Sequence, residues 1–322
     1  MSVLGISVWG LGRHARRRIL PALSSIDELS LVGVCSRNAE TVAECAQQWS
    51  CHGWTNPDEM LSNPKVDIVY ISTPIGVHSA QAIQAFKAGK HVWCEKPLTC
   101  DFEDTIKLVR LAEQGKQLLA EAFMYLHHPQ FSRVLKFVNG GEAGRVHTVI
   151  CRFGIPFLNE PGFRHDPNLG GGALWDVGSY TVSAVLELFP GQNAQVLFAE
   201  VCNEEKLQVD VKGRALLRFS GGATTYLEWG IGLGYKNEID LWAEQGSFFC
   251  EKIFSKPENF KPVYRIHDKN GNESLEHGEA TEQFIEMFRY FHGMIEDPEQ
   301  AAKERQRILD RARVMNDIVK YV

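Results

Sequence analysis

The first 120 residues alternate short β-rich runs with segments of helical periodicity, and this rhythm constrains the fold more than any other feature. Strand-like runs occupy 4–9, 31–35, 66–71, 91–94 and 118–120, and helical patterns cover 15–23, 39–49, 78–88 and 102–114. Strands that alternate with helices across short connections form a parallel sheet covered on both faces. We therefore predict an N-terminal Rossmann domain, an α/β domain with a doubly wound parallel sheet, over residues 1–121.

The rhythm changes after residue 121. Residues 145–153, 195–201, 209–219, 224–229 and 238–243 resemble successive strands with few helices between them, and Gly221-Gly222 fits a hairpin turn. Such strands form a largely antiparallel sheet with helices on one face. We predict an α+β domain over 122–322 that carries the substrate. Its last segment, 298–322, is an amphipathic helix that can pack back on either domain.

Composition and charge exclude several classes of protein. A chain of 322 residues can bury two cores, and a net charge of -6 with scattered acids lacks the basic face of a nucleic-acid binder. No stretch reaches the roughly 20 apolar residues of a membrane span. The apolar residues 1–12 have no positive region before them and fit a strand better than a signal peptide. We expect a cytoplasmic protein without nucleic-acid or membrane partners.

The cysteines and histidines do not suggest a metal site. The eight cysteines contain no Cys-x-x-Cys pair, and a chain of this length needs no disulfide framework. His127 and His128 are adjacent, so in a strand they would point to opposite faces, and no carboxylate or cysteine stands at a matching spacing. We therefore predict no metal, while one of these two histidines can still contact substrate.

A glycine motif follows the first predicted strand and opens a helix. The segment Gly10-Leu11-Gly12-Arg13-His14-Ala15 fits the dinucleotide fingerprint G-x-G-x-x-G/A. In that fingerprint the first glycine allows a tight turn, the second lets the backbone approach the pyrophosphate, and the small third residue keeps the helix close to the strand. A glycine turn without a ligand is the alternative. The surrounding strands and helices favour a dinucleotide site.

The end of the second strand bears on the choice of cofactor. NAD-selective sites usually carry an acidic residue there, but Val34-Cys35-Ser36-Arg37-Asn38 has none. Ser36 can hydrogen-bond a 2′-phosphate, Arg37 can pair with it, and Arg13 can approach the same group. The alternative is that Arg37 is a solvated loop charge. We predict that NADP(H) is preferred and that NAD(H) is possible.

Two further strand ends complete the predicted cofactor site. Glu95-Lys96-Pro97 follows the strand 91–94, and Ser72-Thr73-Pro74 ends the strand 66–71. Doubly wound sheets open their ligand crevice at the carboxyl ends of the strands, where a lysine can reach a substrate oxygen. To the residues of the glycine motif, Ser36 and Arg37, the predicted cofactor-binding set therefore adds Thr73, Pro74, His78, Glu95 and Lys96.

The segment Gly170–Tyr180 carries the predicted proton-transfer chemistry. Its three glycines form a turn into a helix, on which Asp176 and Tyr180 are four residues apart and share one face. Hydride transfer at a carbinol carbon needs a partner for the hydroxyl proton, and a tyrosine serves if a nearby cation lowers its pKa from about 10. Lys96 is the obvious cation, and Asp176 can orient it or the substrate. The alternative is a core tyrosine with a satisfied hydroxyl.

Taken together, these motifs carry a family resemblance. Gly10-x-Gly12-x-x-Ala15, Thr73-Pro74, Glu95-Lys96-Pro97 and the run that ends at Tyr180 occur in the order of the glucose–fructose oxidoreductase, inositol dehydrogenase and rhizopine catabolism (Gfo/Idh/MocA) family, which the whole chain resembles. The resemblance implies Lys96 as a catalytic residue, with Asp176 and Tyr180 at the substrate. It also implies that the sheet of the second domain, over 122–322, has one open face, and that this domain binds substrate and forms a homodimer or homotetramer through that sheet.

The resemblance also bears on the substrate. Tyr180 stands where inositol dehydrogenase-like members have histidine, and it resembles the branch of aldose and dihydrodiol dehydrogenases and nucleotide-sugar ketoreductases. Residues 121–125 are similar to the aldose and dihydrodiol group, whereas Leu126-His127-His128 is similar to the ketoreductases. A sugar, polyol or diol is the implied substrate, with a nucleotide-sugar ketoreductase and a non-catalytic dinucleotide-binding regulator as alternatives. The predicted substrate contacts are Met124, His128, Arg164, Trp175, Asp176 and Tyr180, although Arg164 can instead pair with a neighbour and Trp175 can instead belong to the core or an interface.

Overall fold

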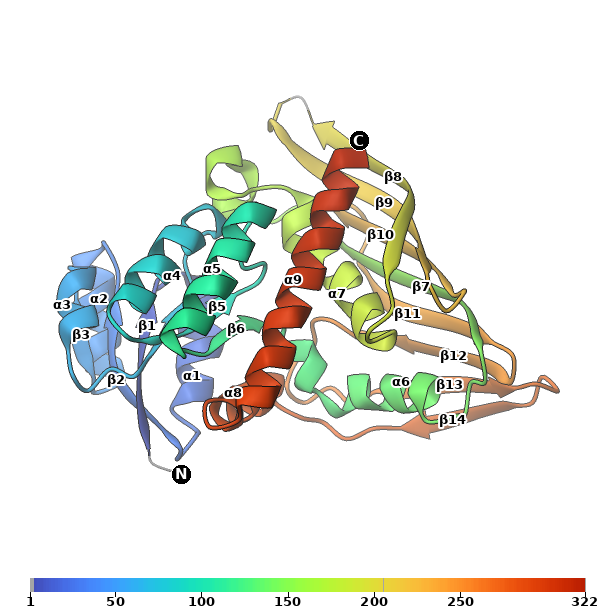
Figure 1. Cartoon of the computed structure of the whole chain (residues 1–322), viewed down its shortest axis with the longest axis horizontal. Coiled ribbons are helices and arrows are strands. Elements are labelled where there is room, and N and C mark those ends of the chain that lie inside the picture. The colour runs from blue at the N-terminus through green and yellow to red at the C-terminus, as the bar shows by residue number, and fades with distance from the viewer. Residues whose placement is uncertain (1–2, 205, 322) are drawn as a thin grey trace. The chain divides into compact units, whose positions relative to one another are not determined.

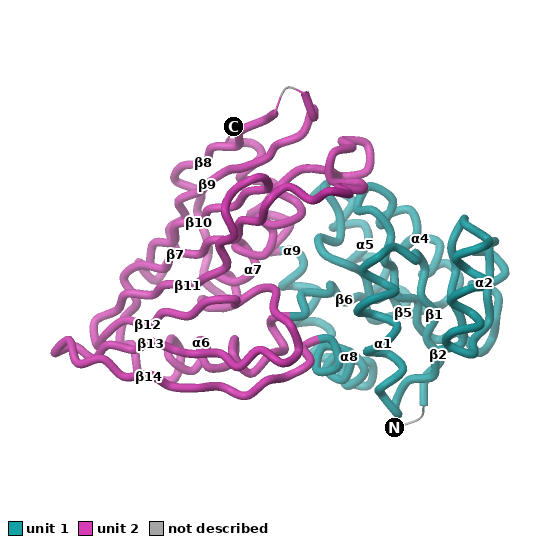
Figure 2. Tube along the Cα trace, turned by 180° about the vertical axis from the view of Figure 1, so that it is seen from behind, with its two compact units in different colours: residues 1–124, 284–309 teal, residues 125–283, 310–322 magenta. Residues whose placement is uncertain are grey.

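The computed structural model describes residues 3–204 and 206–321, and the chain forms two compact units (Figure 2). Unit 1 comprises residues 1–124 and 284–309, and unit 2 comprises residues 125–283 and 310–322. The sequence rhythm predicts a single boundary between 121 and 122. The structure adds residues 284–309 to unit 1, because apolar side chains of this late segment pack against the first sheet.

Unit 1 is built on six parallel strands in the order β3-β2-β1-β4-β5-β6, which confirms the predicted Rossmann fold. Because the order reverses between β1 and β4, the carboxyl ends of these strands flank the crevice where doubly wound folds bind ligands. The three-residue β3 is an edge strand that the sequence analysis missed. The strands are β1 (Leu4–Trp9), β2 (Leu29–Cys35), β3 (His52–Trp54), β4 (Ile68–Ile71), β5 (His91–Glu95) and β6 (Leu119–Ala122).

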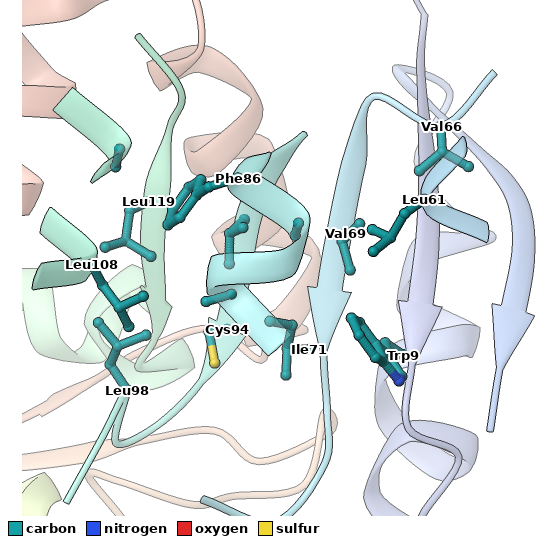
Figure 3. Packing of buried hydrophobic residues seen from close by; sticks show 14 of the residues in the cluster. Trp9, Leu61, Val66, Val69, Ile71, Phe86, Cys94, Leu98, Leu108 and Leu119 are labelled. Atoms are coloured by element: carbon teal, nitrogen blue, oxygen red, sulfur yellow. The ribbon is translucent and has the colours of Figure 1, made fainter. Parts of the chain in front are cut away.

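Helices cover both faces of this sheet. On one face, residues of α3, α4 and α5 and Ile308 of α9 form a core with the strands, part of which Figure 3 shows. On the other face, Phe288 and Phe291 of α8 pack on Trp93, with ring centroids 5.9 and 5.5 Å apart. The helices are α1 (Leu20–Leu23), α2 (Ala39–Gln48), α3 (Pro57–Ser62), α4 (His78–Lys87), α5 (Phe102–Gly115), α8 (Gln283–Met294) and α9 (Pro298–Tyr321), of which α9 contributes to both units.

Unit 2 contains an eight-stranded sheet in the order β14-β13-β12-β11-β7-β10-β9-β8. Every neighbouring pair is antiparallel except β7 and β10, so the largely antiparallel sheet predicted from the sequence is confirmed. The sequence analysis missed β12, β13 and β14. The side chains of β14 are all exposed, so no buried alternation marks it. The strands are β7 (Val146–Ile155), β8 (Ala194–Glu204), β9 (Val209–Phe219), β10 (Thr224–Ile231), β11 (Lys236–Ala243), β12 (Gly246–Glu251), β13 (Val263–Asp268) and β14 (Glu273–His277).

One face of this sheet is covered and the other is open. Helices α6 (Pro129–Asn139) and α7 (Ser179–Leu188) lie on the same side of it (Figure 1), and most side chains of α7 are buried. The opposite face carries charged side chains such as Arg152, Glu228 and Lys236, joined by ion pairs. All eight cysteines are free thiols. Within 3–204 and 206–321, no helix is long and apolar enough to cross a membrane.

Candidate active site

The glycine motif of unit 1 has the backbone geometry of a phosphate-binding turn. Gly10 has a φ of +107°, and a Cβ placed on it would lie 2.5 Å from the carbonyl oxygen of Ser72, so only glycine fits there. A Cβ on Gly12 would meet none of the described atoms within 4 Å, which leaves its backbone open to a ligand. Ala15 is buried and lets the following helix lie against the sheet. The backbone of Gly10, Gly12 and Ala15 thus agrees with the fingerprint, and cofactor binding by these residues stays a prediction.

The helix that follows opens with a π-turn. The sequence predicts one helix over 15–23, whereas the structure has a π-turn over Ala15–Ile19 and a short α1 after it. Pro21 has no N–H and cannot donate to the carbonyl four residues earlier, which favours this departure from an α-helix. π-Turns are common at functional sites, and this one stands beside the predicted pyrophosphate position.

Two arginines, Arg13 of the glycine motif and Arg37 after β2, are available to a ligand. Asn38 caps α2 by accepting a 2.9 Å hydrogen bond from the N–H of Thr41, which fixes the turn that carries Ser36 and Arg37. Arg13 and Arg37 are both exposed, and neither forms an ion pair with any residue that the structure describes. Their guanidinium groups are thus available to an anion.

Glu95 joins the glycine turn to the ends of two strands. Its Oε1 lies 3.0 Å from Nε2 of His14 and accepts a 2.6 Å hydrogen bond from the hydroxyl of Tyr70. Burial raises the pKa of Glu95, but His14, Tyr70 and the charge of Lys96 lower it by more, so the pKa lies below its usual range. Glu95 is therefore a carboxylate that holds His14 in place.

Lys96 lies at the carboxyl end of β5, and the peptide bond to Pro97 is cis. His78 contacts the backbone of this loop. One ring nitrogen lies 3.2 Å from the carbonyl oxygen of Pro97, and the other lies 2.9 Å from that of Thr73. Burial lowers the pKa of His78 despite these contacts. The side chain of His78 is fully buried, and its position indicates that it holds the loops of Thr73-Pro74 and Lys96-Pro97. A contact between His78 and the cofactor stays a prediction.

In unit 2, a glycine turn leads into the predicted catalytic helix. A π-turn over Leu174–Gly178 precedes α7, so the helix begins with a wider turn than the sequence predicts. Asp176 and Tyr180 are both largely buried, with 6% and 7% of their surface exposed. The ring of Tyr180 packs edge-on against Phe153, with centroids 5.2 Å apart. Packing of this kind fixes the direction of the phenol.

Arg164 pairs with Asp176. Its Nε donates a 2.5 Å hydrogen bond to Oδ2 of Asp176, and its guanidinium lies over the ring of Phe163. The N–H of Gly172 donates to the carbonyl oxygen of Arg164 at 3.0 Å, so the turn holds the backbone of the arginine in place. Of the two alternatives for Arg164, the structure contains the ion pair with a neighbour. A substrate contact stays a prediction.

The remaining predicted substrate residues occupy different environments. Met124 is buried at the start of a 3₁₀ turn in unit 1, and Trp175 is half-buried beside Asp176. His128 is fully buried, and its Nδ1 caps α6 by accepting a 2.9 Å hydrogen bond from the N–H of Gln130. Burial and the charge of Lys256 lower the pKa of His128 to about 3. These features give Nδ1 of His128 a structural role, and the substrate contact of His128 stays a prediction.

Sequence reasoning missed Asp210 of β9. Its Oδ2 accepts a 2.7 Å hydrogen bond from the N–H of Leu174, the first residue of the π-turn that carries Asp176. Asp210 belongs to no motif, and 36 residues separate it from Leu174, so no sequence signal could have found it. No group of three or more potential metal ligands occurs among residues 3–204 and 206–321.

Comparisons with known proteins agree with this architecture. The family model described as "Oxidoreductase family, NAD-binding Rossmann fold" matches residues 4–123, and that of the GFO/IDH/MocA C-terminal domain matches residues 131–249. The chain therefore belongs to the Gfo/Idh/MocA oxidoreductase family, as its motifs predict. It is an NAD(P)-dependent oxidoreductase that acts on CH–OH groups.

Individual relatives differ in substrate. The chain is 34% identical to dTDP-3,4-didehydro-2,6-dideoxy-alpha-D-glucose 3-reductase of Saccharopolyspora spinosa, across 82% of this chain and 79% of that one. It is 31% identical to D-xylose 1-dehydrogenase (NADP(+)) 2 of Haloferax volcanii, across 66% of this chain and 65% of that one. A 3-ketoreductase from Actinomadura kijaniata, solved with NADP and TDP-benzene, is similar in structure with a TM-score of 0.92, at 27% identity, covering 98% of this chain and 97% of that one.

Proposed function

We propose that this protein transfers hydride between NADP(H) and a carbinol or carbonyl carbon of a sugar-type molecule, with Lys96 and Tyr180 acting on its oxygen. The observation that carries this proposal is the pair Asp176 and Tyr180, buried and fixed by packing at the start of α7. A buried phenol and carboxylate on one helix are suited to moving a hydroxyl proton. A non-catalytic regulator would not need them.

In the proposed reaction, the bound nicotinamide supplies or accepts the hydride. The phenol of Tyr180 gives its proton to the carbonyl oxygen during reduction, or takes the hydroxyl proton during oxidation. Lys96 supplies the positive charge that eases ionisation of a phenol. Asp176, held by Arg164, orients the hydroxyl groups of the substrate.

We infer a preference for NADP(H) from the end of β2. Ser36 offers a hydroxyl, and the exposed guanidinium groups of Arg13 and Arg37 have no ion-pair partner among the described residues. A 2′-phosphate would supply one. We expect Arg37→Ala to weaken NADPH binding by about tenfold or more, which is about 1.4 kcal/mol, and to leave NADH binding within about twofold. Tighter binding of NADH than NADPH by the wild-type protein would refute the preference.

The substrate class divides into two candidates. A free sugar, polyol or diol is the first, and a nucleotide-linked keto-sugar is the second. The second is favoured by the similarity to a dTDP-sugar 3-reductase and to a 3-ketoreductase solved with TDP-benzene. The similarity to a D-xylose dehydrogenase supports the first.

Initial rates distinguish the two candidates. NADP reduction would be measured with D-xylose, D-glucose and vicinal diols, and NADPH oxidation with a dTDP-linked 3-keto-sugar, with NAD(H) in parallel. Turnover of a free sugar would assign the protein to the sugar dehydrogenases. Turnover of only the nucleotide-linked sugar would make it a ketoreductase. Tight NADPH binding without turnover of any of them would contradict the proposed function.

We also propose that two copies associate through the open face of the eight-stranded sheet. A hollow of about 450 Å³ in this sheet is lined by Gly154, Gly230 and the charged Arg152 and Glu228, among others. On the same face Trp242 is 64% exposed, which is unusual for a residue of this size. Trp242→Arg is expected to lower the molar mass measured by light scattering to that of the monomer, 36.3 kDa. Val319→Arg, on the exposed side of α9, is the control; a Trp242→Arg protein with unchanged mass would contradict this interface.

A further inference from the structure

We propose that Asp210 is a positioning residue for the reaction: from β9 it caps the π-turn of unit 2 and thereby sets the places of Asp176 and Tyr180. The proposal rests on the proposed function, because it takes Asp176 and Tyr180 as the groups that act on substrate. Asp210 itself acts through the turn.

The first support is the way in which this helix begins. The first N–H groups of a helix have no partner within the helix, and a side chain just before it usually accepts from one of them. Ala173 stands at that position and has no side-chain oxygen. Asp210 replaces the missing local cap, because its carboxylate accepts from the N–H groups of Leu174 and Ala173. The cap of this helix thus comes from a neighbouring strand.

The second support is the space that the glycine turn leaves for the carboxylate. Gly172 has a φ of +117°, and a Cβ on it would collide with Oδ1 of Asp210. The absent side chain therefore makes room for the carboxylate against the turn. The contact with Asp210 is therefore enough to explain why residue 172 is glycine, and no bound ligand is needed for this explanation.

The third support is a second contact between the same layers. The indole of Trp229 in β10 lies against both the π-turn and β9: a Cβ on Gly178 would be 3.0 Å from its ring, and a Cβ on Gly213 would collide with it. Asp210 holds the beginning of the π-turn, and Trp229 holds its end. Two fixed points define where the side chains between and just after them lie, including Asp176 and Tyr180.

Keeping the partly buried carboxyl group of Asp210 ionised costs free energy of folding. Burial raises the pKa of Asp210 to about 6, although the N–H groups that it accepts from oppose this shift. Above this pKa the protein therefore keeps a carboxylate in partial burial. A charge held at such a cost fits a positioning role better than a contribution to stability, since functional sites often sacrifice stability.

The test compares Asp210→Ala and the nearly isosteric Asp210→Asn with Asp240→Ala. Asp240 is a half-buried residue of β11 in the same sheet, and its side chain makes no hydrogen bond with the described residues. We expect kcat to fall by roughly 10- to 100-fold in Asp210→Ala, since small displacements of reacting groups cost about that much. We expect less loss in Asp210→Asn, whose amide oxygen still accepts one N–H. The Kd for NADPH should stay within about twofold of wild type.

Two readouts separate positioning from a merely structural role. Asp210→Asn should unfold at a temperature no lower than wild type while kcat falls. Amide hydrogen exchange of the segment 173–180 in the folded protein should be faster in Asp210→Ala than in wild type and in Asp240→Ala. Unchanged exchange, or a kcat within twofold of wild type in Asp210→Ala, would overturn the proposal. If Asp210→Ala does not fold, a normal kcat in Asp210→Asn would also overturn the proposal.

A double variant separates this proposal from the proposed function. The rates are those for whichever of D-xylose, D-glucose and the dTDP-linked 3-keto-sugar the wild-type protein turns over. If Asp210 acts through the turn that carries Asp176 and Tyr180, Asp210→Ala should lower kcat by a smaller factor in the Tyr180→Phe background than in the wild-type protein, because groups that act as a unit are not additive. A full additional loss would overturn the role of Asp210. A normal kcat in Tyr180→Phe alone would instead refute the proposed role of Tyr180.

Discussion

Each unit contains a glycine turn that leads into a π-turn, yet the two turns are used in opposite ways. In unit 1, the turn at Gly10–Ala15 leaves open space in front of Gly12, so the start of the helix can receive an anion. In unit 2, Asp210 occupies the space in front of Gly172 and accepts from the first N–H groups. The first helix start is available to a phosphate, whereas the second already contains a carboxylate of the protein.

Similar backbone geometry can therefore either leave room for a ligand or hold the protein's own side chains in place. A helix start filled by the protein's own carboxylate cannot recruit an anionic part of the substrate. It can hold Asp176 and Tyr180 in a defined direction.

The largest effect is expected at Tyr180. Tyr180→Phe removes the hydroxyl and keeps the ring that packs on Phe153. Because a lost acid/base group typically costs 10²-fold or more, kcat should fall by about that factor. NADPH binding, followed by fluorescence, should not change. Phe153→Leu is a control for packing without loss of the hydroxyl, and its kcat should fall less.

Substitutions in the two glycine turns should change different quantities, NADPH affinity for the turn of unit 1 and kcat for the turn of unit 2. Gly10→Ala places a Cβ 2.5 Å from the carbonyl oxygen of Ser72, so NADPH affinity should fall by about tenfold or more. Gly172→Ala should leave that affinity unchanged and lower kcat, because the new Cβ displaces Asp210. Gly89→Ala is the control: its φ is +77° with nothing within 4 Å, so it adds backbone strain without a clash. Equal loss of NADPH affinity in all three variants would remove the contrast.

Asp210, which contacts the turn of unit 2, and Glu95, which contacts the turn of unit 1 through His14, should give opposite pH dependences of stability. The pKa of Asp210 is raised to about 6, so the folded state binds its proton more tightly than the unfolded state. This contribution is present below about pH 4 and is lost as the pH rises through 6; it amounts to at most about 3 kcal/mol. Relative to Asp210→Asn, the wild-type protein should therefore lose stability between pH 4 and pH 6.

The smallest effect on stability is expected at Glu95, where stability rises with pH instead of falling. Its pKa is lowered, chiefly by His14 against the opposing effect of burial, so its contribution to stability is present above the pKa of the unfolded chain. That contribution is lost as the pH falls through the folded value. Relative to Glu95→Gln, the wild-type protein should lose stability on acidification below about pH 4.5. Chemical denaturation at several pH values measures both slopes, and slopes of the same sign would contradict the comparison.

The alternation of strands and helices made the Rossmann sheet and its glycine turn predictable from the sequence. Both depend on residues that are close along the chain: the strand 4–9, the turn at Gly10 and the small residue Ala15. The sheet of unit 2 was predictable over β7 to β11, where buried and more exposed residues alternate. It was not predictable at β14, whose side chains are all exposed.

Individual side chains were less predictable than the elements that carry them. His128 follows a motif that resembles substrate-binding segments, yet it is fully buried and caps α6. His78 was placed at the cofactor, yet it lies between the carbonyl oxygens of Thr73 and Pro97. In both cases packing around the ring decided what the nitrogens contact, and the predicted ligand contacts stay predictions.

Local motifs in the sequence encode the family, the NAD(P)-binding Rossmann domain and the segments that carry Lys96, Asp176 and Tyr180. Only the tertiary structure brought Asp210 of β9 to the start of the helix at Leu174, and residues 284–309 to the sheet of unit 1. Backbone conformation and periodicity depend on neighbours along the chain and can be read from it. Contacts across 36 or more residues arise only when strands and helices pack.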